Sequence, residues 1–390
     1  MLYKKTDDTV LKLLEKISCG SISIELHDGR IFEFCAPQKG PSAKLRINTP
    51  DVLWNMAVGG DAAFARDYKA GKWDCEDIAV LVDFAFRNDK ALGGLVGGSQ
   101  IKRSLFWLAA QLKPNTRQRA RSNIHAHYDL GNKFYSLWLD PTMTYSSAIF
   151  SGASDTLTQG QLAKYDRILD RLDGSPKDLL EIGCGWGGFA DRAISDRDHR
   201  VTGLTISPAQ AEYARTRLQP LGAQADIRLE DFRAPRRRFG SIVSIEMFEA
   251  VGERYWKTYF DSLKVQLDVG GKAMIQTIAI DDNHFESYRK GGDAIRDLIF
   301  PGGLLPSEKR LRDEVARAGF RICDIFRFGS NYAETLDRWL ATFDRQRSEV
   351  EALGFDNGFI RLWRFYLASC SGAFRSGRTD VMQIEIQHAE

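Results

Sequence analysis

The sequence predicts an α/β protein built on a doubly wound, mostly parallel sheet, with a second and smaller α/β domain at the N-terminus. From residue 178 onward, short apolar runs alternate with helical stretches, which is the rhythm of βαβ units. The first of these runs ends in a glycine-rich turn, EIGCGWGG at 181–188, where open α/β sheets commonly bind ligands. Near the N-terminus, two alternating runs instead flank a short polar turn, which predicts a hairpin in a separate domain.

The elements of the larger sheet can be assigned in order. The predicted strands are 178–182, 201–205, 225–229, 241–246 and 272–279. Helices are predicted between them, notably at 208–218 and 255–267. Ser207 is suited to cap the first of these helices, and Pro208 to occupy its first position, where a missing N–H costs nothing.

The chain is long enough for two domains. Its 390 residues exceed what a typical single core accommodates. We place the boundary between an N-terminal domain at 1–112 and a larger domain at 113–390. In the N-terminal domain, 21–26 and 31–35 alternate like strands around the turn HDG at 27–29.

A segment at the domain boundary has two interpretations. Its first part, SLFWLAAQL at 104–112, is apolar and aromatic, and Lys113, Arg117, Arg119 and Arg121 follow. One interpretation is a helix that packs on the core and leads into a solvated basic linker. The other is a segment lying on an anionic membrane surface, because such a segment needs an apolar face beside basic residues.

Composition excludes several classes of function. The net charge of +2 gives no whole-molecule attraction to nucleic acid, and 43% hydrophobic residues is ordinary for a globular protein. The six cysteines form no CxxC pair and the six histidines no HExxH motif, so no metal site is predicted. Scattered single thiols are typical of a reducing compartment. We recognise no signal peptide and no membrane-spanning run, which predicts a cytoplasmic protein whose membrane contact is peripheral.

Three kinds of ligand compete for the glycine-rich turn. A Walker phosphate loop is excluded because no GK[ST] follows, and a dinucleotide turn would need its acid about 20 residues downstream. Here Glu181 precedes the turn, which contains Gly183, Gly185 and Gly187. This order resembles motif I of the S-adenosylmethionine (SAM) methyltransferases, and SAM has no phosphate but a sulfonium and an amino-acid end that an acid and bare backbone can hold. These four residues are the predicted cofactor site, the alternative being a purely structural strand-to-helix turn.

Two later stretches supply further predicted contacts to SAM. Thr205 ends the second strand, where many SAM folds place an acid for the ribose hydroxyls, and Gln210 follows in the next helix. We expect Gln210 to take that hydrogen-bonding role beside Thr205. After the third strand, Glu230 and Asp231 offer carboxylates that can accept a hydrogen bond from the adenine amino group.

Several ordered motifs resemble those of the cyclopropane-fatty-acid synthase family. They are HYDLGN (127–132), LDPTMTYS (139–146), EIGCGWGG (181–188), GLTISPAQ (203–210), SIEMFEAVG (244–252) and YLASCSGAFR (366–375). The resemblance covers nearly all of 115–390 and extends more loosely to the N-terminal domain. It implies a Rossmann-like SAM-methyltransferase sheet, and it adds Tyr145 and Ser146 to the expected cofactor residues.

The family moves a methyl group from SAM to the double bond of an unsaturated acyl chain, commonly in a membrane phospholipid. The resemblance therefore implies unsaturated phospholipid acyl chains as substrate and a lipid-presenting role for 1–112. It also implies peripheral contact with the anionic inner face of the membrane. Dimers occur in the family, so a homodimer is a further expectation, whereas nucleic acid is not an expected partner.

Cyclopropane synthases are understood to use a bound bicarbonate as the base that removes the final proton. By resemblance, Glu249, Tyr332 and Cys370 belong to the residues that hold it. Ser147 and Gln276 stand where the family has a cysteine and a histidine. Two alternatives follow: the serine and the amide still hold an anion through hydrogen bonds, or Glu249 is itself the base through a raised pKa.

The two altered positions also bear on the product. Attack of the alkene on the methyl group leaves a carbocation, for which Tyr145, Phe248, Tyr332 and Phe374 are candidate aromatic neighbours. Loss of a proton from the new methyl group then closes a cyclopropane ring, whereas loss from a neighbouring carbon leaves a branched chain. Because two usual ligands are replaced, we expect a methyl- or methylene-branched chain rather than a ring.

Two other functions compete with this interpretation. One is a SAM-dependent methyltransferase of a small non-lipid molecule, against which the TYSSA and YLASC motifs argue. The other is a lipid-binding protein with a vestigial SAM site, against which the intact glycine-rich turn argues.

Overall fold

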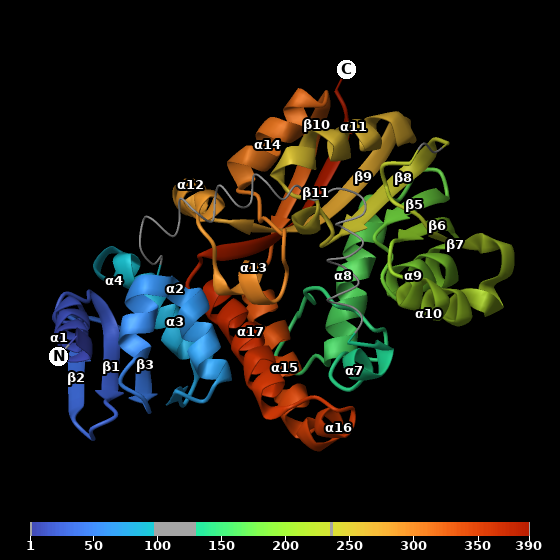
Figure 1. The fold of residues 1–390 in the computed structure, drawn as a ribbon. Coiled ribbons are helices and arrows are strands. Elements are labelled where there is room, and N and C mark those ends of the chain that lie inside the picture. Colours follow the sequence, from blue (N-terminus) through green and yellow to red (C-terminus); the bar gives the residue numbers. More distant parts are fainter. Residues whose placement is uncertain (1, 97–129, 235–236, 390) are drawn as a thin grey trace. The chain divides into compact units, whose positions relative to one another are not determined.

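The computed structural model describes residues 2–96, 130–234 and 237–389 of the chain (Figure 1). The chain divides into two compact units. The first consists of Met1–Lys113, Asn283–Pro301 and Trp339–Thr379, and the second, which we call the sheet unit, of Pro114–Asp282, Gly302–Arg338 and Asp380–Glu390.

The sheet unit is built on a seven-stranded sheet of order β10-β11-β9-β8-β5-β6-β7. Its strands are β5 (Asp178–Ile182), β6 (Arg200–Thr205), β7 (Ala225–Leu229), β8 (Phe239–Ile245), β9 (Leu267–Ile280), β10 (Phe320–Arg327) and β11 (Thr379–His388). Neighbouring strands from β7 to β9 run parallel, whereas β10 and β11 are antiparallel. The predicted α/β fold with a doubly wound sheet is therefore confirmed, and every strand predicted for it is present.

The helices that lie wholly within the sheet unit include α7 (Asn132–Ser136), α8 (Leu157–Arg171), α9 (Gly188–Arg197), α10 (Pro208–Leu218), α11 (Trp256–Gln266) and α14 (Glu308–Arg317). Five of them form two packed groups. Residues of α8, α9 and α10 share one hydrophobic core with Leu179 and Val243 of the sheet, while α11 packs against α14. Ser207 Oγ accepts a hydrogen bond of 3.3 Å from Gln210 N, and Pro208 begins α10, so the predicted start of this helix is confirmed.

The first unit contains the predicted hairpin. β1 (Cys19–Glu25) and β2 (Ile31–Cys35) pair antiparallel, and Gly29 in the turn has a φ of 83°. β3 (Gln38–Ile47) and β4 (Trp73–Cys75) complete a sheet of order β2-β1-β3-β4. The helices of this part are α1 (Leu2–Leu14), α2 (Val52–Lys69), α3 (Ile78–Arg87) and α4 (Asp89–Val96).

Segments from far along the sequence complete the first unit. They include α13 (Ala294–Leu298), α16 (Arg347–Ala352) and α17 (Asn357–Arg375), whereas α12 (Asp282–Lys290) and α15 (Gly329–Arg345) each include residues of both units. α17 packs so closely on α3 that a Cβ on Gly372 would lie 2.5 Å from Ala79 O. Arg361 of α17 pairs with Asp74 at 2.8 Å. The assignment of 1–112 and 113–390 to separate domains stays a prediction, and its boundary lies outside the described residues.

Within residues 2–96, 130–234 and 237–389, each helix is too short or too polar to span a lipid bilayer. The same part of the chain has no group of three or more His, Cys, Asp or Glu side chains placed to bind a metal ion. The segment 104–121, for which a membrane-surface interpretation was considered, lies outside the described residues.

Candidate active site

The glycine-rich turn lies at the carboxyl end of β5. Gly183, Gly185 and Gly187 have φ values of 84°, 51° and 83°. Residues other than glycine rarely adopt this backbone conformation. A Cβ on Gly183 would lie 2.9 Å from Met247 Cγ, but a Cβ on Gly185 would meet no atom of the described residues within 4 Å. The turn therefore needs glycine for its backbone, and at Gly185 it faces open space where a ligand can approach.

Glu181 lies on β5 just before this turn and is buried at 3% exposure. Burial raises the pKa of its carboxyl group to about 8, against the influence of Lys164. Its Oε2 is buried and has no hydrogen-bond partner among the described residues. A buried acceptor of this kind calls for a donor, and a SAM hydroxyl or ammonium group would supply one.

Lys164, on α8, is a functional candidate that the sequence analysis missed. It is fully buried, and its Nζ donates a hydrogen bond of 2.6 Å to Ser146 Oγ. Burial lowers the pKa of its ammonium group to about 7, opposed by Glu246, Asp140 and Glu181. The available signal was its position within the apolar stripe of a helix, because a lysine there must find polar partners.

The segment that contains Tyr145 and Ser146 lies beside the glycine-rich turn. The ring of Tyr145 lies 5.5 Å from that of Tyr135, which in turn lies 5.1 Å from Trp186 in the turn itself. Ser146 is held on its other side, since its carbonyl accepts from Gln161 Nε2 at 2.8 Å. Two predicted cofactor residues are thus brought to the edge of the sheet where the turn lies.

The predicted pair at the end of β6 is also brought together. Thr205 Oγ1 donates to Gln210 Oε1 at 2.9 Å, and accepts from Ser207 N at 3.2 Å. In this arrangement the amide nitrogen of Gln210 has no partner among the described residues. It is therefore available to donate a hydrogen bond to a ribose hydroxyl.

The acids after β7 are placed differently from each other. Glu230 N donates to Thr205 O at 2.9 Å, so the backbone of Glu230 lies beside the end of β6. Asp231 forms an ion pair with Arg233, whose Nη2 lies 2.6 Å and Nε 2.8 Å from the carboxylate oxygens. Since Arg233 already binds that carboxylate, a contact between Asp231 and adenine would compete with the ion pair. The adenine contacts expected of Glu230 and Asp231 stay predictions.

Three of the predicted proton-removal residues converge on Glu246, which directly follows β8. Tyr332 Oη donates to Glu246 Oε2 at 2.6 Å, while Gln276 Nε2 and Ser147 N donate to Oε1 at 2.7 and 2.9 Å. These donors come from α15, β9 and the loop before α8. The sequence analysis treated Glu246 only as the last residue of a strand, so its position among these residues was missed.

The backbone of Glu246 is strained and held in place. Its φ of 48° is left-handed, which costs a non-glycine residue about 1–2 kcal/mol. Its N–H donates to Gln276 O at 2.8 Å, and Gln276 Oε1 accepts from Gln383 Nε2 at 3.0 Å. Arg167 then donates to Gln383 Oε1 at 2.8 Å, so this chain of contacts turns the amide nitrogen of Gln276 toward Glu246.

Glu249 lies in the following turn, η2 (Phe248–Ala250), with different partners. Its Oε1 accepts from Thr277 Oγ1 at 2.9 Å and from Ile278 N, while Oε2 is buried without a partner among the described residues. Burial, and then Glu246, raise the pKa of the Glu249 carboxyl group to about 8. Glu249 is therefore a half-buried residue with one buried carboxyl oxygen beside Glu246, and its catalytic role stays a prediction.

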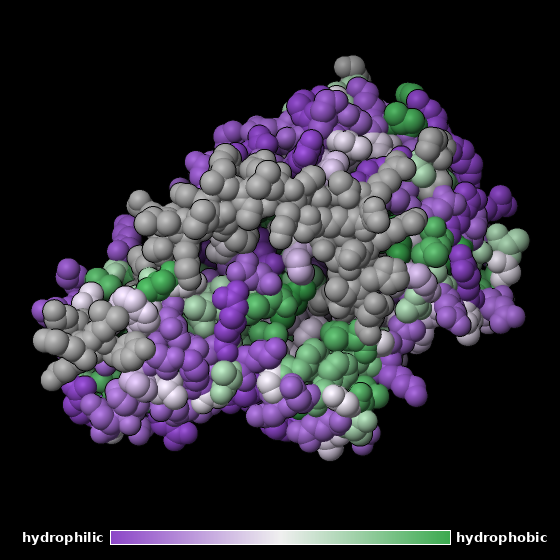
Figure 2. Space-filling view, in the orientation of Figure 1, coloured by the Kyte–Doolittle hydropathy of each residue, from purple (hydrophilic) through white to green (hydrophobic). Residues whose placement is uncertain are grey.

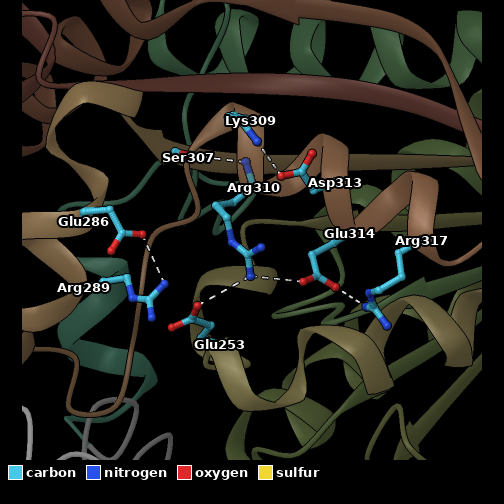
Figure 3. A network of polar contacts seen from close by, with 9 residues as sticks. All are labelled: Glu253, Glu286, Arg289, Ser307, Lys309, Arg310, Asp313, Glu314 and Arg317. Carbon is cyan, nitrogen blue, oxygen red and sulfur yellow. Dashed lines mark hydrogen bonds and ion pairs between the residues drawn. The ribbon is translucent and has the colours of Figure 1, made fainter.

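An ion network fixes the chain that follows these two glutamates (Figure 3). Arg310 of α14 lies 3.6 Å from Glu253 and 3.3 Å from Glu314, and its guanidinium stacks 5.9 Å from the Trp256 ring centroid. Arg317 also pairs with Glu314. Glu253 begins the turn η3 (Glu253–Tyr255), so the network ties the loop after β8 to α14.

Three further candidates do not belong to the Glu246 cluster: Phe248 is enclosed by other aromatic side chains, and Phe374 and Cys370 belong to the first unit. Phe248 is fully buried among Trp256 and Tyr259, with ring centroids 5.4 and 4.9 Å away. Phe374 and Cys370 lie on α17 of the first unit. Burial raises the pKa of the Cys370 thiol to about 12, so it is neutral near pH 7, and its role as an anion ligand stays a prediction.

Comparison with known proteins identifies the family. Residues 115–384 match the family model of mycolic acid cyclopropane synthetases. The chain belongs to this family. It is 36% identical over 369 residues to the tuberculostearic acid methyltransferase UfaA1 of Mycobacterium tuberculosis, covering 89% of this chain and 83% of that protein. It is 32% identical over 348 residues to the cyclopropane-fatty-acyl-phospholipid synthase of Escherichia coli K12, covering 88% of this chain and 87% of that protein.

Solved structures agree with this membership of the cyclopropane synthase family. The mycolic acid cyclopropane synthase CmaA1, in complex with S-adenosylhomocysteine and CTAB, superimposes with a TM-score of 0.64 at 31% identity, covering 68% of this chain and 98% of that chain. Coclaurine N-methyltransferase shares the fold alone, with a TM-score of 0.64 at 16% identity and coverage of 83% and 98%. The protein is a SAM-dependent methyltransferase.

The residues at the carboxyl edge of the sheet fit SAM. The open backbone at Gly185 gives the ligand room, and Glu181 Oε2 and the Gln210 amide are polar groups that await partners. When bound, SAM supplies an electrophilic methyl group. The consecutive residues Ser146 and Ser147 link Lys164, beside Glu181, to Glu246. The cofactor turn and the carboxylate cluster thus share this edge of the sheet.

Proposed function

We propose that this enzyme transfers the methyl group of SAM to the double bond of an unsaturated acyl chain carried by a membrane phospholipid. The observation that carries the proposal is the shielded cluster of Glu246, Tyr332 and Gln276 beside the cofactor turn. An alkene methyl transfer needs no base to activate the nucleophile, but it needs a group that accepts a proton from a carbon acid afterwards. A buried carboxylate held by neutral donors suits that task.

The environment of this cluster suits a cationic intermediate. A carbocation in contact with water would be trapped as an alcohol, so the reacting edge has to exclude water. The carboxylate of Glu246 lies at this edge, where its negative charge favours a developing cation, whereas the raised pKa of Glu249 keeps that acid neutral near pH 7. Tyr145 and Tyr332 offer aromatic rings nearby, whose faces attract cations.

We propose a methyl- or methylene-branched chain as the product. The replacement of a cysteine and a histidine by Ser147 and Gln276 supports this choice. Two relatives with high coverage are named as methyltransferases of tuberculostearic acid and of fatty acids, the second from Pseudomonas putida at 35% identity over 93% of this chain. Relatives named as cyclopropane synthases are also similar, at 32–33% identity, so ring closure is the competing outcome.

A phospholipid substrate requires contact with a membrane surface, which we propose is peripheral. Figure 2 shows one face of the molecule, where hydrophobic residues gather in patches among hydrophilic ones. Arg238 precedes β8, whereas Glu246 follows it, and the 7 residues of this strand lie between them, which separates the two residues by about 26 Å. Arg237, moreover, pairs with Asp178 at 2.8 Å. Arg237 and Arg238, the basic residues before this strand, therefore lie at the edge of the sheet opposite to the proposed reaction.

Lipid analysis of cells tests the proposal. Cells with and without the protein are fed methyl-labelled methionine, and their membrane lipids are examined by mass spectrometry. We expect a phospholipid acyl chain that is heavier by one CH2 unit and carries the label, and that takes up hydrogen on catalytic hydrogenation. A labelled chain that is heavier by one CH2 unit but resists hydrogenation would replace the branched product by a cyclopropane, and the absence of any labelled acyl chain would refute the lipid substrate.

A further inference from the structure

We infer that the carboxylate of Glu246 occupies the place of the bicarbonate base and itself accepts the proton that the reaction releases. The inference rests on the proposed function for its chemistry, but its structural part concerns only residues of the sheet unit. It differs from the expectation drawn from the sequence, in which Ser147, Gln276 and Tyr332 hold a free anion or Glu249 is the base.

The donors around Glu246 form a set that matches a carboxylate. Oε1 accepts from Gln276 Nε2 and Ser147 N, and Oε2 accepts from Tyr332 Oη, all at 2.6–2.9 Å. Distances in this range are typical of hydrogen bonds to a charged oxygen. The donors expected to bind a bicarbonate are therefore satisfied by a side chain of the protein.

A separate bicarbonate does not fit this arrangement. To reach the same donors it would have to displace Glu246, whose backbone N–H is bonded to Gln276 O. A bicarbonate placed alongside would instead add an anion next to Glu246 and Glu249, two carboxyl groups whose pKa values burial already raises. Repulsion between like charges in a shielded site opposes that placement.

The contribution of each predicted ligand also differs from a bicarbonate site. Ser147 reaches Glu246 through its backbone N–H, while its hydroxyl donates to Ala148 O at 3.0 Å. Gln276 is oriented by Gln383, so that its nitrogen rather than its oxygen faces the carboxylate. Both contacts suit a carboxylate that is held in place because it belongs to a side chain of the protein.

The groups that face Glu246 allow it to gain and lose a proton. Desolvation favours its neutral form, while Tyr332, Lys164, Ser147 N and Gln276 favour the charged form. In the step we infer, a C–H bond of the cationic acyl chain breaks, and its electron pair becomes a ring bond or a double bond. The proton bonds to a carboxylate oxygen of Glu246 and leaves to water before the next turnover, so no further reactant is needed.

The backbone of Glu246 makes a decisive variant available. Because its φ of 48° is readily adopted by glycine, Glu246→Gly removes the carboxylate without straining the chain. It leaves the donors of Tyr332, Gln276 and Ser147 around a space the size of a small carboxylate. Glu246→Gln is the matched control, because it fills the same space with an amide that cannot accept the proton.

The test uses the purified full-length chain, vesicles of monounsaturated phosphatidylglycerol and methyl-labelled SAM, in buffer freed of carbon dioxide. We expect the wild type to keep its rate within about twofold when bicarbonate is added or removed. Glu246→Gly should lose about 100-fold, the typical contribution of a general base, and regain at least tenfold with bicarbonate or formate. Glu246→Gln should lose as much and regain nothing. SAM affinity, measured by calorimetry, should be unchanged in both variants, which excludes misfolding.

Two outcomes overturn the inference. One is a wild-type rate that falls tenfold or more without bicarbonate and returns with it; the other is a Glu246→Gln variant as active as the wild type. A second readout separates this failure from failure of the proposed function. Carbon-13 bicarbonate, followed by NMR, should bind Glu246→Gly and not the wild type, whether or not the phospholipid is the right substrate. Binding of equal strength to both proteins would refute the structural part of the inference.

Discussion

Tyr332 Oη donates a hydrogen bond of 2.6 Å to Glu246 Oε2. This contact joins α15 to the loop after β8, and it favours the charged form of Glu246, whose pKa burial otherwise raises. The strength of the carboxylate as a base therefore depends on a phenol that the sequence analysis had assigned to a bound anion.

Removal of this donor should change the pH dependence of the reaction. In Tyr332→Phe, Glu246 loses a partner of its charged form, so its pKa rises and the rate reaches its plateau at a higher pH than in the wild type. We expect kcat/KM at pH 7 to fall about 10- to 100-fold, with partial recovery as the pH increases. Label transfer from SAM measured between pH 6 and 9 checks this. Tyr213→Phe, on α10, is the matched control; equal pH profiles for Tyr332→Phe and the wild type would contradict the assignment.

The open side of the glycine-rich turn predicts a separation between folding and cofactor binding. A Cβ at Gly185 would meet no atom within 4 Å in the part of the chain that the structure describes, so Gly185→Val should fold, at a cost of about 1–2 kcal/mol for its φ of 51°. Its side chain would take the space of the ligand, and SAM affinity should fall at least tenfold. Calorimetry and thermal unfolding measure the two effects. If Gly185→Val binds SAM as the wild type does, the cofactor does not lie against this turn.

Ser147 should tolerate the loss of its hydroxyl. The group that contacts Glu246 is the backbone N–H of Ser147, and the hydroxyl bonds only to Ala148 O. Ser147→Ala should therefore retain activity within about twofold. Gln276→Leu, by contrast, removes the side-chain donor to Glu246 and one of the two acceptors of Gln383 Nε2, which costs about 1–3 kcal/mol of stability. A tenfold loss of label transfer in Ser147→Ala would show that the hydroxyl takes part.

The two altered positions also make a prediction about the product. Ser147→Cys combined with Gln276→His restores the residues expected from the family, and should raise the share of cyclopropane in the product. Gas chromatography of the methyl esters, before and after hydrogenation, measures that share. The single Ser147→Cys variant is the control, since it keeps the backbone N–H. An unchanged product in the double variant would mean that these positions do not decide ring closure.

Glu249 predicts a pH-dependent stability. The pKa of its carboxyl group is about 8 in the folded protein against 4.5 for a solvent-exposed glutamate, so the folded state holds its proton more tightly than the unfolded state does. Its contribution to stability is fully present below pH 4.5 and is lost as the pH rises toward 8.

Replacement of this acid by an amide should remove the effect. The free energy of unfolding of Glu249→Gln, relative to the wild type, should increase by on the order of 4 kcal/mol between pH 5 and pH 8.5. Urea unfolding at both pH values measures it. Glu33→Gln, on the exposed side of β2, serves as the control. A constant difference between Glu249→Gln and the wild type would mean that Glu249 titrates normally.

Sequence periodicity predicted the strands that carry the site but not the outer strands of the sheet. β5 and β7 match their predicted bounds, because a short apolar run between helices is buried most readily as a strand of the central sheet. β11 was missed since Gln383 and Glu385 are buried within it, and polar residues at core positions conceal the strand pattern.

The candidate site was partly predictable for a related reason. The glycine-rich turn and the pair of Thr205 and Gln210 are local, so their spacing alone indicated them. The role of Glu246 depends on donors from α15, β9 and the loop before α8, and no spacing in the sequence predicts such a meeting. Lys164 was hidden in the same way, because its partners lie in other segments.

The most direct test of the central claim is transfer of label from methyl-labelled SAM to vesicles of monounsaturated phospholipid by the purified protein, compared with vesicles of saturated phospholipid. We predict labelled acyl chains, heavier by one CH2 unit, from the unsaturated vesicles only, formed about 100-fold more slowly with Glu246→Gln in place of the wild type. Label in neither kind of vesicle, with SAM binding intact, would contradict the assignment of an unsaturated acyl chain as the methyl acceptor.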